Sequence, residues 1–216
     1  MPTPLFAFAS EVEFKRLFPS MEAPCTGAIP VAAGRARVAV LGVGLLEFSA
    51  NLARLLSSGE FSAVYLFGIC GAYKGRGIEL GEVLRIDSET VGDLGVEEGD
   101  GAFTPWARVG GGTPKVYRAA PLEAAPPWLA SLKGAAGITV NCCTGTEAVA
   151  RMRSLLFDAD VESMEGAAVF AVSSALGIPA YQVRAVSNFV GARNKPAWKI
   201  SSALLSLKQV LAQALG

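Results

Sequence analysis

The sequence of 216 residues contains no histidine. Without an imidazole, the Ser-His and Cys-His nucleophile systems and the usual catalytic zinc sites are excluded. Any chemistry must therefore use carboxylates, amides, hydroxyls, lysine, arginine or backbone groups. The sequence accordingly predicts a site that uses neither a metal nor a cofactor.

An excess of charge of either sign is also missing, because 19 basic residues balance 19 acidic ones. A neutral chain gives no electrostatic indication of binding to nucleic acid or to an anionic membrane. No apolar run approaches the roughly 20 residues that a membrane helix needs. The N-terminal segment, MPTPLFAFASEVEF, lacks the basic start of a signal peptide. We therefore expect a cytoplasmic protein that binds neither nucleic acid nor membrane.

Cysteine is scarce as well, with four residues in the whole chain. Cys142 and Cys143 are adjacent in an apolar, strand-like run and cannot form an ordinary disulfide with each other. In a cytoplasmic protein, cysteines in the core stay reduced and pack as small apolar side chains. We expect this state for all four, which are Cys25, Cys70, Cys142 and Cys143.

The sequence does contain a regular alternation of apolar, strand-like runs and helical patterns, which is typical of α/β proteins. Hydrophobic residues make up 51% of the chain, enough for a large core, and no linker or repeat interrupts it. We expect one domain over residues 1–216, a three-layer sandwich with a mostly parallel central sheet. The predicted strands are 5–9, 37–41, 62–67, 82–86, 138–143 and 181–186, and the predicted helices begin at 11 and cover 45–58, 147–156, 164–176 and 199–215.

Glycine-rich stretches follow two of the predicted strands. Residues 42–44, GVG, lack the third glycine of a dinucleotide-binding turn because Glu47 stands there, so we interpret them as a tight strand-to-helix turn. Residues 68–72, GICGA, are predicted to form a turn whose glycines let backbone N–H groups approach a ligand, or a tight turn alone. Residues 88–127 are long for a structureless loop, which predicts either a functional lid or short strands.

Residues 161–194 place polar side chains in an otherwise apolar stretch. Glu165 opens the predicted helix 164–176, and Ser187 and Asn188 close the strand that follows it. Burying such groups without partners costs roughly 1–3 kcal/mol each. Open α/β sheets bind ligands just beyond the carboxyl ends of their strands. We therefore interpret these carboxylate, hydroxyl and amide groups as parts of a binding site.

Two further strand ends carry polar residues for which two roles stay open. Glu13 either closes a capping box with Ser10 or faces a pocket at the end of the first strand. Thr144 and Thr146 either cap the helix that follows them or lie near a ligand. Arg153, in that helix, is expected on its solvated side.

Two segments resemble paired motifs of the nucleoside phosphorylase and methylthioadenosine nucleosidase family: SMEGA at residues 163–167 and RAVSN at residues 184–188. The ASEVE start at residues 9–13 and the glycines of residues 68–72 are similar too, and the resemblance covers nearly the whole chain. The two motifs together are fairly specific, although each piece alone is not. The resemblance implies a nucleoside phosphorylase-like fold, a small purine nucleoside as substrate and a homo-oligomer, either a dimer or a multiple of dimers.

The resemblance also implies a role for each matched residue. Met164 and Glu165 correspond to the pair that holds the ribose, with Glu165 accepting the sugar hydroxyls. Glu13 corresponds to the glutamate that positions and activates the attacking water. Asn188 stands where the adenine-specific nucleosidases carry an aspartate that donates a proton towards the base N7. The other implied residues are Ile69 and Gly71 near the sugar and water, Thr144 and Thr146 near the base, and Ser187, with Phe103 and Trp106 as candidates from a neighbouring subunit.

An asparagine at position 188 carries information about the leaving base. Its amide is no useful acid, but it offers one acceptor and two donors. The carbonyl of Asn188 can accept from a protonated N7, and its NH2 group can donate to a 6-oxo group but opposes the amino group of adenine. Hydrogen-bond mismatch in a buried site discriminates strongly. The sequence therefore predicts release of hypoxanthine, a 6-oxopurine.

Glu13 in turn favours hydrolysis over phosphorolysis. Phosphorylases of this family hold phosphate with a glycine-rich, arginine-bearing N-terminal loop, whereas an acidic segment stands at that place here. A carboxylate repels phosphate but can take a proton from water. Arg16, one turn further on, keeps phosphorolysis open. Two more hypotheses stay open as well: a nucleosidase of the methylthioadenosine/S-adenosylhomocysteine type, and a nucleoside-binding module without catalytic activity.

Overall fold

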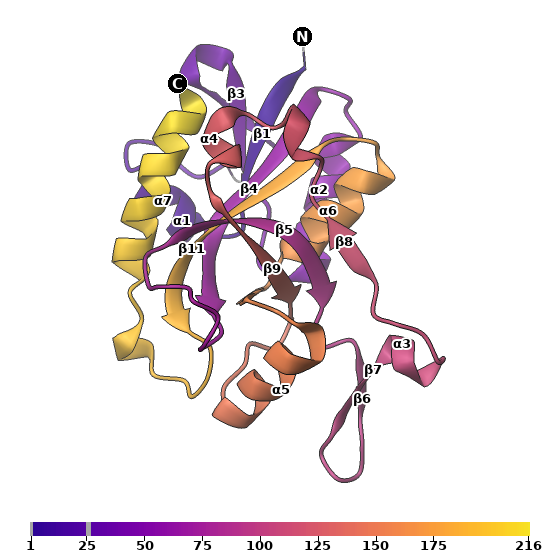
Figure 1. Ribbon diagram of the computed structural model, residues 1–216. Coiled ribbons are helices and arrows are strands. Elements are labelled where there is room, and N and C mark those ends of the chain that lie inside the picture. Colours follow the sequence, from indigo (N-terminus) through magenta and orange to yellow (C-terminus); the bar gives the residue numbers. More distant parts are fainter. Residues whose placement is uncertain (1, 25–26) are drawn as a thin grey trace.

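A nine-stranded sheet forms the centre of the computed structural model, which describes residues 2–24 and 27–216 (Figure 1). The strands lie in the order β10-β9-β5-β11-β4-β1-β3-β2, with β8 paired to β5, and β6 and β7 form a separate two-stranded sheet. Their bounds are β1 Thr3–Phe8, β2 Ile29–Val31, β3 Ala36–Val40, β4 Phe61–Ala72, β5 Val83–Val91, β6 Gly95–Glu97, β7 Phe103–Pro105, β8 Val116–Arg118, β9 Lys133–Thr139, β10 Val161–Ser163 and β11 Ala180–Phe189.

The large sheet is mixed, because five of its pairings are parallel and four are antiparallel. Parallel pairing runs through β3-β1-β4-β11 and again through β5-β9-β10. The two parallel runs meet at an antiparallel pairing of β11 with β5. The sheet is thus less parallel than the sequence predicted. Apolar runs reveal that a strand is buried on both faces, but they do not reveal the direction of its neighbours.

β4 is 12 residues long because it pairs with different neighbours along its length. Its end, Gly71 and Ala72, pairs with Glu162 and Val161 of β10, which also pairs with β9. The strands β10-β9-β5-β11-β4 therefore close into a ring. The turn predicted at residues 68–72 is wrong, since these residues continue the strand.

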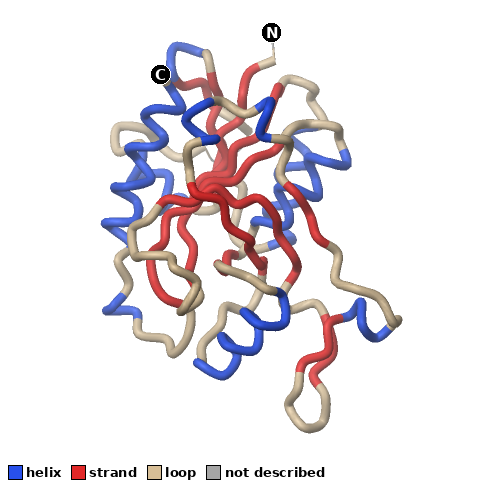
Figure 2. The backbone as a smooth tube through the Cα atoms, in the orientation of Figure 1, coloured by secondary structure: helices blue, strands red, loops and turns tan. Residues whose placement is uncertain are grey.

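Helices cover both faces of the sheet, with α1 and α7 on one side and α2 and α6 on the other (Figure 2). Successive side chains of β1 point to opposite faces of the sheet and therefore pack against both helix layers. Phe6 and Phe8 pack with α1 and α7, whereas Leu5 and Ala7 pack with α2 and α6. The three expected layers are present. Among the described residues, none of the helices combines the length and the apolar character of a membrane-spanning segment. The helices are α1 Glu11–Leu17, α2 Leu45–Leu56, α3 Trp106–Val109, α4 Pro127–Ala130, α5 Glu147–Phe157, α6 Gly166–Ala175 and α7 Ile200–Leu215.

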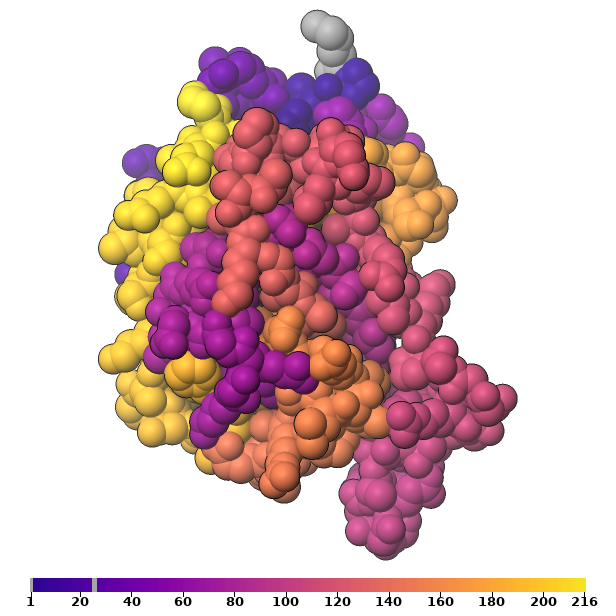
Figure 3. Space-filling view, viewed as in Figure 1, coloured from indigo at the N-terminus to yellow at the C-terminus, as the bar shows by residue number. Residues whose placement is uncertain are grey.

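Residues 88–127 contain short strands, which was one of the two interpretations of this stretch. They hold the end of β5, the β6–β7 hairpin, α3 and β8. The hairpin and α3 project from the body of the molecule (Figure 3). Phe103 lies against Gly95 within the hairpin, and Trp106 at the start of α3 is 61% exposed.

The cysteines lie in two different environments. Cys70 is a buried, free thiol in β4, whereas Cys142 and Cys143 are free and exposed. The strand predicted to contain this pair ends before it, and the Asp93 carboxylate accepts the backbone N–H of Cys142 in the loop. The expectation of core cysteines is therefore wrong for these two, and Cys25 lies outside the described residues.

Substitution of Leu207 by alanine tests the packing of α7. Leu207 is fully buried against the sheet, so Leu207→Ala should lower the free energy of unfolding by about 2–5 kcal/mol. Leu205 is a matched control, because it is 62% exposed on the same helix, and Leu205→Ala should cost less than about 0.5 kcal/mol. Urea denaturation followed by circular dichroism measures both, and equal losses would contradict this packing.

Candidate active site

A cavity of about 280 Å³ opens where the carboxyl ends of β1, β4 and β11 meet β10 and the start of α6. Its lining includes the carboxylates of Glu13, Glu162 and Glu165 and the guanidinium groups of Arg184 and Arg193. Trp198 and Leu204 are among its apolar lining residues. Parallel strands gather their following loops at this edge, as the sequence predicted. Among the described residues, no group of three or more cysteines, aspartates and glutamates is placed to hold a metal ion.

Glu13 both closes a capping box with Ser10 and faces the cavity, the two roles that the sequence left open. Its Oε2 accepts the backbone N–H and the hydroxyl of Ser10, which closes the capping box of α1. Its Oε1 accepts the N–H of Ile69 at 3.0 Å, and the side chain lines the cavity. Burial raises the pKa of Glu13, while the Arg184 guanidinium opposes the rise. A buried carboxylate with a raised pKa is a stronger base than an exposed one.

Glu165 is held from two sides at the beginning of α6. Its Oε2 accepts Nη2 of Arg184 at 3.2 Å, and its Oε1 accepts the N–H of Gly44 at 3.2 Å. Gly44 has a positive φ of 87°, which glycine adopts without strain. The turn after β3 therefore contributes a backbone donor to the site. Met164, the preceding residue, lines the same cavity.

Arg184 lies between the two carboxylates and is 1% exposed. Arg184 donates hydrogen bonds to Glu165 and, at 3.3 Å, to the carbonyl oxygen of Ile69. The N–H of Ile69 in turn donates to Glu13. A Cβ on Gly68 would lie 2.5 Å from Nη1 of Arg184 and 2.9 Å from Oε1 of Glu13. The missing side chain at Gly68 thus provides the space in which the cation approaches the Glu13 carboxylate.

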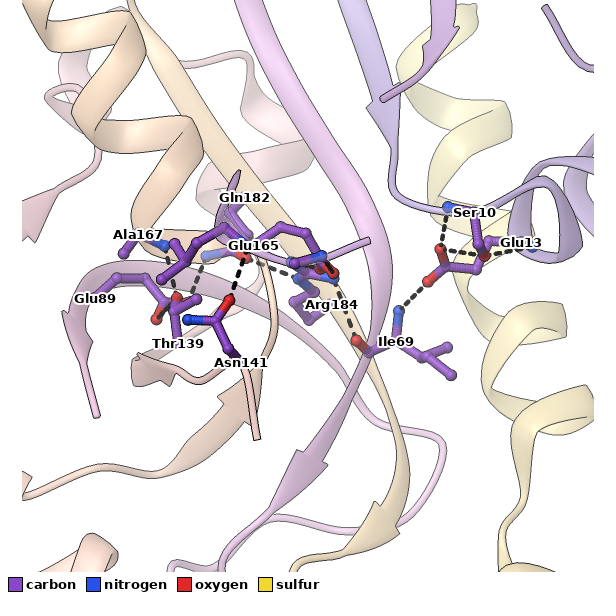
Figure 4. A network of polar contacts seen from close by, with 12 residues as sticks. Ser10, Glu13, Ile69, Glu89, Thr139, Asn141, Glu165, Ala167, Gln182 and Arg184 are labelled. Atoms are coloured by element: carbon purple, nitrogen blue, oxygen red, sulfur yellow. Dashed lines mark hydrogen bonds and ion pairs between the residues drawn. The ribbon is translucent and has the colours of Figure 1, made fainter. Parts of the chain in front are cut away.

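A chain of buried polar side chains continues behind Arg184 (Figure 4). Gln182 accepts a hydrogen bond from Nε of Arg184 at 2.7 Å and donates one to Glu89 at 2.9 Å. Glu89 also accepts a hydrogen bond from the Thr139 hydroxyl at 2.9 Å. Sequence reasoning missed Arg184, Gln182, Glu89 and Thr139 as a group. In a strand whose apolar and polar residues alternate, a buried polar residue cannot be told from one that faces solvent. The spacing of Gln182 and Arg184, two residues apart in an otherwise apolar strand, was the available signal that both are buried on the same face.

A second polar cluster fixes the loop between β9 and α5 against the cavity. Glu162 accepts the N–H of Thr144 at 2.8 Å and its hydroxyl at 2.6 Å, accepts the hydroxyl of Tyr73 at 2.8 Å and pairs with Arg153 at 3.3 Å. Arg153 is therefore buried, and its expected position on the solvated side of α5 is wrong. Thr144 lines the cavity, whereas Thr146 caps α5 through its hydroxyl.

A β-bulge brings Ser187 and Asn188 to the cavity together. The register slips by one residue at Ser187, so that Asn188 lies opposite Gly71 of β4. A bulge lets consecutive side chains face the same space. The Ser187 hydroxyl has two acceptors for its one proton, Oδ1 of Asn188 at the shorter 2.8 Å and the Cys70 carbonyl oxygen at 3.1 Å. Nδ2 of Asn188 donates to the Phe189 carbonyl at 3.2 Å. One acceptor position and one N–H of the amide are left for a ligand.

Three predicted site residues do not line this cavity. Thr146 is exposed at the start of α5, and Phe103 and Trp106 belong to the β7–α3 segment, so a contact from a neighbouring subunit stays a prediction for these two. Phe189 and Trp198 supply aromatic lining that the sequence pattern did not indicate. The predicted residues that do line the cavity are Glu13, Ile69, Gly71, Thr144, Met164, Glu165, Ser187 and Asn188.

Comparison with known families agrees with this architecture. Residues 21–215 match the family model described as the phosphorylase superfamily. The chain belongs to the phosphorylase superfamily. Two of its relatives in this superfamily are each named futalosine hydrolase. The Thermus thermophilus protein is 31% identical over 181 residues, which cover 81% of this chain and 78% of the relative. The Streptomyces coelicolor protein is 34% identical over 172 residues, which cover 77% of this chain and 72% of the relative.

Solved structures confirm the nucleoside phosphorylase-like fold of this superfamily member. The 5′-methylthioadenosine/S-adenosyl homocysteine nucleosidase of Helicobacter pylori superposes with a TM-score of 0.77 at 14% identity, covering 98% of this chain and 97% of the other. The futalosine hydrolase of Helicobacter pylori superposes with a TM-score of 0.76 at 14% identity, covering 98% and 96%.

Substitution of Gly68 by alanine tests the close approach above β4. The new Cβ would displace the Arg184 guanidinium and the Glu13 carboxylate, so Gly68→Ala should lower both stability and any turnover. A displacement of about 1 Å at an active site can cost about 100-fold in rate. Gly99→Ala is the matched control, because nothing lies within 4 Å of its Cβ position. Thermal melting shows the stability change, and a wild-type melting curve for Gly68→Ala would contradict the arrangement.

Glu89 makes the free energy of unfolding depend on pH. Burial raises its pKa from 4.5 to about 7, against the opposing effects of Gln182 and Arg184. Between these values the folded protein holds a proton that the unfolded chain has lost, so stability must fall as pH rises through this window. We expect wild-type stability to fall from about pH 5 to pH 8 by on the order of 3 kcal/mol more than that of Glu89→Gln. Denaturant midpoints measure this difference, and parallel pH curves would contradict it.

Proposed function

We propose that this protein is a nucleosidase that hydrolyses the N-glycosidic bond of futalosine, releasing hypoxanthine and dehypoxanthinyl futalosine in menaquinone biosynthesis. The observation that carries the proposal is the meeting of two buried carboxylates, Glu13 and Glu165, in one cavity on either side of Arg184. Binding a ribose needs only one of them. The name shared by relatives that are 31% and 34% identical supports futalosine as the substrate.

In the proposed reaction, Glu165 and Met164 hold the ribose so that the bond between C1′ and N9 is oriented for cleavage. As this bond lengthens, the electron pair leaves with the base and the sugar becomes oxocarbenium-like. Glu13 takes a proton from a water molecule, whose oxygen bonds to C1′. The departing base takes a proton at N7 from solvent, and the proton held by Glu13 returns to solvent, so the step balances. Catalysis in this scheme is positioning and electrostatic stabilisation by fixed groups.

Asn188 has the hydrogen-bonding capacity that a 6-oxopurine requires. The Ser187 hydroxyl and the Phe189 carbonyl each occupy one position on its amide. The remaining acceptor position suits a protonated N7, and the remaining N–H suits a 6-oxo group. The amino group of adenine would meet that N–H instead. Both points support hypoxanthine over adenine as the leaving base.

Hydrolysis is favoured over phosphorolysis by the position of Arg16, the cation of the N-terminal segment. Arg16 is exposed on α1 and is absent from the cavity wall, whereas Glu13 on the same helix lines it. The buried Arg184 already donates to Glu165, Gln182 and the Ile69 carbonyl. Arg193 also lines the cavity but is exposed, whereas a phosphate at the buried end would meet the carboxylates of Glu13, Glu162 and Glu165.

The proposal extends to the setting of the enzyme. We expect the whole chain, residues 1–216, to act as one nucleosidase domain in the cytoplasm, on a small purine nucleoside and without nucleic acid or membrane as a partner. We expect a homo-oligomer, a dimer or a multiple of dimers. Phe103 and Trp106 are the candidates for contact with a neighbouring subunit, and Trp106 is exposed as such a contact requires.

Base release by the purified protein tests the proposed substrate. Futalosine, inosine and methylthioadenosine are incubated side by side in phosphate-free buffer, and the products are separated by chromatography. We expect hypoxanthine from futalosine alone. Adenine from methylthioadenosine would contradict the role of Asn188, and release only after phosphate addition would contradict hydrolysis. Stoichiometric binding without turnover would indicate a nucleoside-binding module.

Substitution of each carboxylate tests the mechanism. Glu13→Gln removes the base and should lower kcat by about 100- to 10,000-fold. Glu165→Gln misplaces the ribose and should lower kcat by about 100-fold. Glu11→Gln is the matched control on α1, because Glu11 is exposed and pairs with Lys15. Near-normal turnover in either active-site variant, with the fold intact by circular dichroism, would remove that residue from the mechanism.

A further inference from the structure

Glu89 has a carboxyl group buried deep behind the cavity, and its side chain is 1% exposed. Its carboxylate occupies space that two glycines leave open. A Cβ on Gly137 of β9 would lie 2.6 Å from Oε1 of Glu89, and a Cβ on Gly166 of α6 would overlap the carboxylate. Burying an ion costs several kcal/mol unless its partners compensate. Two elements, β9 and α6, therefore accommodate one carboxylate that does not itself line the cavity.

The first connection from Glu89 to the site runs through β11. Oε1 of Glu89 accepts Nε2 of Gln182 at 2.9 Å, and Oε1 of Gln182 accepts Nε of Arg184 at 2.7 Å. Arg184 then donates to Glu165 at 3.2 Å. Because the carboxylate can only accept, it fixes the orientation of the Gln182 amide. That orientation presents an oxygen to Arg184.

The second connection runs through β9 to the first turn of α6. Oε2 of Glu89 accepts the Thr139 hydroxyl at 2.9 Å, and the same hydroxyl oxygen accepts the N–H of Ala167 at 2.7 Å. Ala167 is the second residue of α6, and Glu165 is the residue before the helix. A negative charge near a helix N-terminus is also favourable. Glu89 thus constrains Glu165 through its ion-pair partner and through its own backbone.

We propose that Glu89 is a positioning residue of the glycosidic reaction, which sets Glu165 in place by orienting Arg184 through Gln182 and by anchoring the start of α6 through Thr139. The inference rests on the proposed function, because it gives Glu89 a role in the same site. It predicts that the direction of the hydrogen bonds matters more than the identity of any one side chain. Exchanging the acid and the amide between positions 89 and 182 should preserve that direction.

The exchange can be traced atom by atom. In Glu89→Gln alone, the new amide places its NH2 group either against the NH2 group of Gln182 or against Thr139, whose hydroxyl proton then loses the acceptor that Glu89 supplies. In the double variant Glu89→Gln/Gln182→Glu, the new amide donates to the carboxylate at 182 and accepts from Thr139. The carboxylate at 182 still accepts from Arg184. All the bonds are remade, and the net charge is unchanged.

Turnover of futalosine by four proteins tests this proposal: the wild type, Glu89→Gln, the exchanged double variant, and Asp87→Asn as the matched control. Asp87 lies on the same strand and pairs with Arg85, and its side chain is 45% exposed. Assays are run at about pH 8, above the pKa of Glu89. Thermal melting and circular dichroism establish the folded fraction of each protein, so that kcat is expressed per folded molecule.

We expect Glu89→Gln to lower kcat by about 10- to 100-fold, the double variant to recover most of the loss, and Asp87→Asn to match the wild type. Normal kcat in Glu89→Gln would overturn the proposal. So would a folded double variant that is no more active than Glu89→Gln, because a merely structural role predicts that activity follows the folded fraction. Absence of turnover in the wild type would instead contradict the proposed function.

Discussion

A buried guanidinium, that of Arg184, is the group on which the rest of the site depends. Taking such a cation out of water is costly, and the cost is offset only where anions and further acceptors surround it. Glu165, the Gln182 amide and the Ile69 carbonyl supply these acceptors, and the Glu13 carboxylate lies close by. The same cation opposes the rise that burial causes in the pKa of Glu13. The position of Arg184 therefore determines both the geometry and the charge of the proposed active site.

The requirements of this cation extend into the surrounding fold. Gly68 lacks a side chain where a Cβ would lie 2.5 Å from the guanidinium of Arg184 and 2.9 Å from the carboxylate of Glu13. Closure of the sheet between β4 and β10 brings Glu162 beside Gly71 and holds the loop that carries Thr144 at the cavity. Stability and site geometry are thus coupled, since strands far apart in the sequence must pair before the cavity exists.

The sequence identified polar residues that interrupt apolar runs. Glu13 and Asn188 follow or end predicted strands and Glu165 opens a predicted helix, and the structure brings all three to one cavity. It could not show that residues 68–72 continue a strand, because the partner strand β10 lies far along the chain. Nor could it show that Gln182 and Glu89 face each other, since their contact depends on the register between strands rather than on local pattern.

The pH dependence of kcat/KM for futalosine, measured in phosphate-free buffer, tests the central claim that ionised Glu13 activates water. Burial raises the pKa of Glu13 above its ordinary 4.5, so the base becomes protonated as pH falls through that higher value. The account predicts that kcat/KM declines on the acid side with a pKa above 4.5 in Glu89→Gln as well as in the wild type, because that variant lacks the other buried carboxylate that titrates above 4.5. Adding Glu13→Gln to Glu89→Gln should abolish this decline. A decline centred at or below 4.5 in Glu89→Gln, or one retained in the double variant, would contradict the account.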